Sequence, residues 1–188
     1  MRAASYGDPG PGGHDGAVTD APLIVSLLLD PETQDRLDRE RAALFPAERL
    51  VVGAHVTLFH ALPATLRDEV ETVLAEAAGS LPLEVRVHDV YSLDRGVAYR
   101  LLCPELEELH RGWQQRWRTH LTRQDAQRLH LHATVQNKVA SSTARRTLDD
   151  LRARFTPSTA EGIALELWRY DGGPWTHLAR FDPGSSPA

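Results

Sequence analysis

The chain has 188 residues, 41% of them hydrophobic and 25% charged, which fits one folded domain and excludes a large multidomain assembly. Its longest apolar run, residues 23–29, is far shorter than the about 20 residues of a membrane-spanning helix, and no secretory signal precedes it, so we expect a cytoplasmic protein without membrane contact. A net charge of −5 does not attract nucleic acid over the whole surface, so an anionic ligand needs a local site.

The hydrophobic pattern alternates between strands and amphipathic helices along the chain. Residues 1–21, rich in Gly and Pro, and residues 183–188 are expected to be disordered tails. Asp30 and Pro31 mark the start of the first helix, because aspartate caps a helix and proline fits its first turn. We expect strands at residues 22–29, 54–60, 83–93, 97–102, 130–136, 163–170 and 176–181. We expect helices at residues 31–44, 64–78, 104–119 and 142–155.

The order strand, helix, strand, helix, strand occurs twice in this pattern. Corresponding strands within each half follow one another at intervals of about 30 residues. Sequence identity between the halves is low, so the inference rests on element order and spacing. It predicts a duplicated α+β unit.

The same short motif occurs at the matching point of each half. Ala-His-Val-Thr-Leu-Phe contains His55 and Thr57, and Leu-His-Ala-Thr-Val-Gln contains His132 and Thr134. Side chains two residues apart lie on one face of a strand, so each histidine shares a face with its threonine and the intervening apolar residues face a core. A third His-x-Thr, at His120, follows a helix and has no counterpart. The repeated pair therefore predicts a polar site built from two strands.

The two His-x-Thr strands resemble the two-histidine (2H) phosphoesterase superfamily, and within it the 2′-5′ RNA ligases. Further similarities are Phe45-Pro46 before the first motif, Gln136-Asn137-Lys138 after the second, and the closing segment at residues 168–175. The resemblance implies an α+β fold with two pseudo-symmetric lobes, each an antiparallel sheet with helices packed outside, around a central cleft. We expect a single domain over residues 22–182, with lobes, interleaved or separate, at about residues 22–93 and 94–182.

The residue types of the motifs suit phosphodiester cleavage. The reaction needs a base for the attacking oxygen and an acid for the leaving oxygen, and two imidazoles near neutral pH supply both. The hydroxyls of Thr57 and Thr134 can stabilise the charge on the phosphoryl oxygens. The sequence has no acidic cluster, no zinc signature and no phosphate-binding Gly-rich loop, and the lone Cys103 cannot build a zinc site. We therefore expect no metal and no cofactor.

The resemblance implies a substrate with a 2′,3′-cyclic phosphate, at an RNA end or on a nucleotide, or with a 2′-5′ linkage. Water is the commoner acceptor, so hydrolysis is favoured over ligation. The family pattern implies that His55 is the acid and His132 the base, and the sequence leaves the reverse order open. The expected enzyme is a monomeric cyclic phosphodiesterase acting on an RNA end, a short oligonucleotide or a cyclic nucleotide.

Further residues are candidates for substrate binding. His130 shares a strand face with His132, Lys138 follows the second motif on the same face if the strand extends that far, and Tyr170 and Trp175 flank the closing turn, where an aromatic ring could stack a base. Each has an alternative: a supporting or solvent-exposed role for His130, a solvated strand end for Lys138, and hairpin packing for the aromatic residues. Additional phosphate-binding candidates are Arg100 and Arg128.

Two other classes of function are open. A nucleotide-binding module could retain the cleft without turnover, but both histidines and both threonines are present together. A metal-dependent hydrolase could use His55, His60, His130 and His132, but the motifs contain no Asp or Glu. The negative net charge disfavours long RNA and leaves short substrates.

Overall fold

An antiparallel sheet of seven strands is the framework of the protein in the computed structural model, which describes residues 21–184. The predicted tails at residues 1–21 and 183–188 fall almost entirely outside the described residues. The order across the sheet is β2 (Val56–Leu62), β1 (Leu23–Leu29), β6 (Ser158–Tyr170), β3 (Leu83–Ser92), β4 (Val97–Leu102) and β5 (His132–Gln136), and β7 (Trp175–Phe181) pairs with β6. This confirms an α+β fold with an antiparallel sheet.

The strand order is symmetric with respect to the two halves of the chain. Exchanging β1, β2 and β3 with β4, β5 and β6 leaves the order β2-β1-β6-β3-β4-β5 unchanged when it is read from the other end. The third strand of each half pairs with the first strand of the other, since β3 pairs with β4 and β6 with β1. The duplicated element order is therefore confirmed, and the strands of the two halves interleave.

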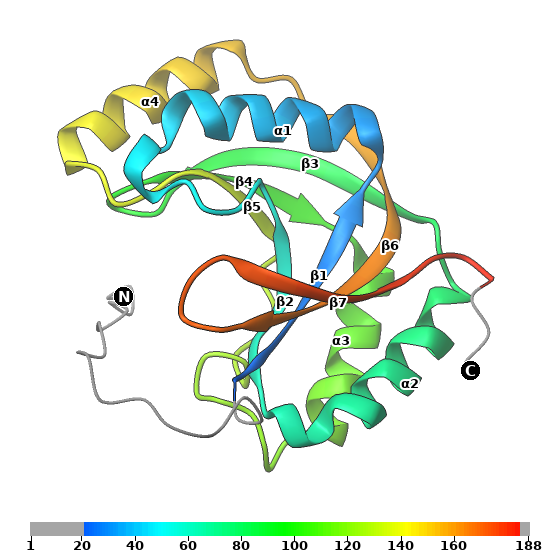
Figure 1. Cartoon of the computed structure of the whole chain (residues 1–188). Helices are drawn as coiled ribbons and strands as arrows, with labels where there is room; N and C mark the ends of the chain where they lie inside the picture. The colour runs from blue at the N-terminus through cyan, green and yellow to red at the C-terminus, as the bar shows by residue number, and fades with distance from the viewer. Residues whose placement is uncertain (1–20, 185–188) are drawn as a thin grey trace, which may run out of the picture.

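Two pairs of helices lie at opposite ends of the sheet (Figure 1). α1 lies against β5, and α4 lies against β3 and β4. α2 contacts β6 and β7, and α3 reaches β2 through His110 and Trp113. The helices are α1 (Pro31–Leu44), α2 (Arg67–Ala78), α3 (Pro104–Arg116) and α4 (Ser141–Arg154), with 3₁₀ turns at Ala47–Arg49 and Ala64–Leu66.

Local sequence signals explain the start of α1 but not the full length of β6. The Asp30 carboxylate accepts a hydrogen bond from the Thr33 N–H at 2.9 Å, which satisfies one of the free N–H groups of the first turn. The expected strand at residues 163–170 begins five residues earlier, at Ser158, because residues 158–162 pair with β3. The helix expected to reach residue 119 ends at Arg116.

Aromatic side chains fill the core between α3 and β2. Phe59 is fully buried and stacks on His110 at 4.4 Å between ring centroids, and it meets Trp117 edge-on at 5.4 Å. Trp113 and Trp117 are both buried, so both side chains belong to the core. No helix within residues 21–184 has the length and apolar character to cross a membrane.

Candidate active site

The sheet brings the two His-x-Thr strands together. β2 and β5 are the first and last strands in the strand order, yet they contact each other, because the twisted sheet curls back on itself. His55 directly precedes β2 and His132 is the first residue of β5. A positive charge on His132 helps to lower the pKa of His55, so the two imidazoles lie close enough to interact electrostatically.

Both imidazoles are anchored by the same backbone contact. His55 Nδ1 donates to the carbonyl oxygen of Gly53 at 2.8 Å, and His132 Nδ1 donates to the carbonyl oxygen of His130 at 2.7 Å. A carbonyl oxygen can only accept, so the proton of each neutral ring lies on Nδ1. Nε2 of each ring is therefore left to act on a ligand.

The surroundings keep both histidines neutral near pH 7. Burial lowers the pKa of His55 to about 4, and the positive charge of Arg41 adds to the effect, while the bond to Gly53 opposes it. Burial also lowers the pKa of His132, with a further contribution from the charge of His60. A bound phosphate raises both pKa values, because a nearby anion favours the imidazolium.

The threonines lie beside the histidines as the strand period predicts. Thr57 is opposite Ser26 on β1, and Thr134 is opposite Ala98 on β4. Neither threonine hydroxyl forms a hydrogen bond with another residue of the described chain, so both can donate to a ligand. The intervening residues are all buried: Val56, Leu58, Ala133 and Val135.

An aromatic wall stands next to His55. The Trp175 ring lies 4.6 Å from the His55 ring, and Trp168 meets Trp175 edge-on at 6.2 Å. Tyr170 is opposite Trp175 in the hairpin, and within residues 21–184 no ring contact joins it to either histidine. Of the two aromatic residues that flank the closing turn, Trp175 is therefore the one at the site.

Different groups surround His132. The Tyr91 ring lies edge-on to His132 at 6.3 Å, and the Arg100 guanidinium covers Tyr91 at 5.0 Å from the ring centroid. His130 is exposed and lines a cavity beside His132. Lys138 lies outside the strand, because β5 ends at Gln136 and Lys138 has a φ of 60°. The strand therefore does not extend as far as Lys138, and Lys138 does not share the strand face of His132.

A buried arginine joins the two motif segments. Arg41 of α1, only 5% exposed, donates from Nε to the Val52 carbonyl oxygen at 3.1 Å and from a terminal nitrogen to the Thr134 carbonyl oxygen at 2.7 Å. It thus ties the segment that leads to His55 to the strand of the second motif. The sequence signal was a charged residue one turn after Leu37, on the buried face of an amphipathic helix.

A buried carboxylate anchors β2 on its other side. Asp125 accepts hydrogen bonds from the His60 N–H at 2.8 Å and the Ala61 N–H at 3.0 Å, and it pairs with His60 Nδ1 at 3.1 Å. The ring of His60 is therefore engaged by Asp125. Within residues 21–184, no group of three His, Cys, Asp or Glu side chains is placed to hold a metal.

Comparison with known proteins identifies the family. The model of the 2′-5′ RNA ligase superfamily matches residues 29–174. The structure is similar to E. coli LigT complexed with 3′-AMP, with 17% identity over 87% of this chain and 98% of that chain and a TM-score of 0.53. It is also similar to the protein TT0787 of Thermus thermophilus, with 16% identity over 88% and 100% of the two chains and a TM-score of 0.58.

A third similar structure is described as a phosphoesterase, with 17% identity over 87% of this chain and 98% of that chain and a TM-score of 0.55. No curated protein matches the chain in sequence. At these identities the structural likeness shows a shared fold. The family match spans both His-x-Thr strands and most of the chain, so the protein belongs to the 2′-5′ RNA ligase superfamily of 2H phosphoesterases.

Proposed function

We propose that the protein is a metal-independent phosphodiesterase that opens 2′,3′-cyclic phosphates of RNA ends or nucleotides by general acid/base catalysis. The observation that carries the proposal is a pair of imidazoles at the starts of β2 and β5, two strands that contact each other, each imidazole held through Nδ1 so that Nε2 is free. E. coli LigT, which shares the fold, has been crystallised with 3′-AMP, a nucleotide of the kind that ring opening of a 2′,3′-cyclic phosphate produces.

In the proposed reaction one Nε2 accepts a proton from water as the water oxygen attacks phosphorus. The bond from phosphorus to one ribose oxygen breaks, and the protonated Nε2 of the other histidine delivers a proton to that oxygen. The Thr57 and Thr134 hydroxyls donate to the non-bridging oxygens, where negative charge increases in the transition state. The product is a 2′- or 3′-phosphate, and the two histidines exchange protonation states.

The unequal pKa values support His55 as the proton acceptor. When the pair holds one proton, that proton occupies the ring with the higher pKa, and burial lowers the pKa of His55 to about 4. His132 then carries the proton that the leaving oxygen needs. This order is the reverse of the one that the family pattern implies.

We also propose that the site lies in a cleft between two lobes of one domain over residues 22–182. One lobe combines β2, β1, β6 and β7 with α2 and α3, and the other combines β3, β4 and β5 with α1 and α4. The division is supported by β6, whose residues 158–162 pair with β3 while residues 165–170 pair with β7.

The test is hydrolysis of the four nucleoside 2′,3′-cyclic monophosphates in EDTA between pH 4 and 8. We expect turnover that survives EDTA and is lost in His55→Ala and His132→Ala, while His88→Ala, which changes an exposed histidine on β3, retains it. The optimum of kcat/KM is expected below pH 6.5, because the pKa values of both histidines are lowered.

Wild-type turnover in both single variants would overturn the proposal. Tight binding of cyclic nucleotides without turnover by the folded wild type would instead establish a binding module.

A further inference from the structure

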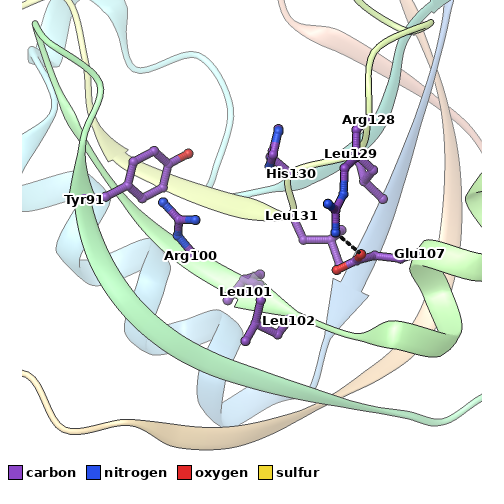
Figure 2. A pocket seen from close by; sticks show the side chains of 9 residues that line it. All are labelled: Tyr91, Arg100, Leu101, Leu102, Glu107, Arg128, Leu129, His130 and Leu131. Atoms are coloured by element: carbon purple, nitrogen blue, oxygen red, sulfur yellow. Dashed lines mark ion pairs between the residues drawn. The ribbon is translucent and has the colours of Figure 1, made fainter.

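A cavity of about 470 Å³ opens beside the second histidine. Its lining includes Tyr91, Arg100, Glu107, Arg128 and His130 (Figure 2), and two lining residues, His130 and Leu131, directly precede His132 in the chain. Pockets of this size commonly hold small ligands. The lining of the cavity includes neither histidine of the acid/base pair and neither threonine of the proposed reaction.

Arg100 is next to His132 in the sheet. The two residues are direct partners on neighbouring strands, so their side chains lie on one face with Cβ atoms about 5 Å apart. The Arg100 guanidinium lies over the Tyr91 ring, and no residue of the described chain forms an ion pair with it. Asp89 is the cross-strand partner of Arg100 on β3 and forms no ion pair with it; the Asp89 carboxylate accepts from the Val90 N–H at 2.7 Å. Arg100 therefore has its charge available for a ligand.

Arg128 faces the same cavity from the loop before β5. It forms an ion pair with Glu107 (Figure 2), at 3.6 Å, and the Arg128 side chain is 81% exposed. An exposed ion pair of this kind is weak, so an incoming anion competes readily for the guanidinium. The cavity is lined by two guanidinium groups and a single carboxylate, so the charge of its lining is positive.

The corresponding position on the His55 side is apolar. Thr57 is opposite Ser26 as Thr134 is opposite Ala98, so two residues further along β1 Leu28 occupies the place that Arg100 has on β4. That side carries the Trp175 and Trp168 rings instead. The cationic cavity is thus a feature of one side only, and the duplicated fold does not require it.

We propose that this cavity binds a second, non-reacting phosphate of the substrate. The inference rests on the proposed function, because the reacting phosphate is taken to lie between His55 and His132. Guanidinium groups match phosphate in geometry and charge, and Arg100 is the cross-strand partner of His132, so a phosphate held by Arg100 would lie next to the reacting phosphate. The preferred substrate is then a nucleotide 2′,3′-cyclic phosphate that also carries a 5′-phosphate, including the end of an oligonucleotide.

The first experiment measures equilibrium binding of two product analogues, adenosine 3′,5′-bisphosphate and 3′-AMP. Wild type is expected to bind the bisphosphate at least about tenfold more tightly, which corresponds to one charge-assisted contact. The ratio is expected to fall toward one in Arg100→Gln and in Arg128→Gln. Arg123→Gln, on the same loop but outside the cavity, is the matched control and should keep the ratio.

The second experiment compares kcat/KM for adenosine 2′,3′-cyclic phosphate with and without a 5′-phosphate. Wild type should prefer the phosphorylated substrate through a lower KM, and added salt should weaken the preference. Equal binding and equal kcat/KM of the paired ligands would overturn this inference and leave the proposed hydrolysis intact. Failure of the proposed hydrolysis would appear differently, as no turnover of either substrate, and the binding ratio would still decide whether the cavity holds a phosphate.

Discussion

The two histidine motifs share one backbone hydrogen bond and differ in the residues that surround it. His55 and His132 are both anchored to a carbonyl two residues earlier. Around His55 lie the Trp175 ring and the charge of Arg41, and around His132 lie Tyr91 and Arg100. The difference shows that a duplicated scaffold supplies two equal imidazoles, while neighbours outside the motifs make one of them harder to protonate.

The largest expected effect separates the acid from the base. Loss of either imidazole should lower kcat/KM for a 2′,3′-cyclic nucleotide by about 10³-fold. With methyl p-nitrophenyl phosphate, whose nitrophenolate leaves without protonation, His132→Ala should recover most of the loss and His55→Ala should recover none. Steady-state rates on the two substrates measure this. Recovery confined to His55→Ala would assign the acid to His55 and contradict our order.

Removal of the buried Arg41 guanidinium should change the surroundings of His55, including its pKa, more than those of His132. Arg41→Met removes two hydrogen bonds between the motif segments, and we expect kcat/KM to fall by about tenfold or more. It also removes a positive charge that lowers the pKa of His55, so that pKa should rise. NMR titration of the histidines measures the shift.

Arg39→Met is the control for that experiment, because Arg39 is on the same helix and bonds only to the Asp35 carbonyl within the described residues. A loss of activity with an unchanged pKa of His55 would show that Arg41 is not placed beside that ring.

The aromatic wall gives a smaller expected effect and tests which hairpin residue belongs to the site. Trp175→Ala should raise KM for a cyclic nucleotide by about fivefold to tenfold, since base stacking contributes on the order of 1 kcal/mol or more. Tyr170→Ala should change KM less, because its ring does not touch either histidine. A larger effect at Tyr170 would contradict the placement of Trp175.

The smallest expected effect is on stability. The pKa of His55, of His132 and of the buried His110 is lowered in the folded protein, so the unfolded chain binds more protons once the pH falls below about 6.5. Stability that is fully present above this pH is then lost as the pH falls toward 4. We expect Tm to drop by about 5 °C between pH 7 and pH 5.

His55→Gln should reduce the dependence of Tm on pH more than His132→Gln, because the pKa of His55 is the one that is strongly lowered. His88→Gln should leave the slope unchanged. Equal slopes in all three variants would show that the two sides of the site do not differ in protonation.

The periodicity of apolar residues predicts those parts of the molecule that are determined by neighbouring residues in the chain. The helices, most strand positions and the two motif faces follow from periodicity, since the spacing of apolar residues in each element indicates which of its faces is buried. The first five residues of β6 were missed because their partner, β3, lies about 75 residues earlier in the chain, and no local pattern specifies a distant partner.

The site was predicted less completely than the strands that carry it. His55, His132 and their threonines follow from the repeat, but Lys138 depended on a strand that ends at Gln136. Trp175 and Tyr170 are both candidates from the sequence, and the contact of the Trp175 ring with the His55 ring distinguishes them. Arg41 was missed because its function is in backbone contacts, which side-chain patterns do not describe.

The exchange of third strands has a consequence for how the molecule comes apart. β6 pairs with β1, β3 and β7, so it links strands from both halves of the chain along its length. If one half melted alone, the first strand of the other half, β1 or β4, would expose an unpaired edge, which is a template for association with other chains. The fold therefore couples the two histidines in an all-or-none manner. One half of the chain cannot unfold without disrupting the strands that position both histidines.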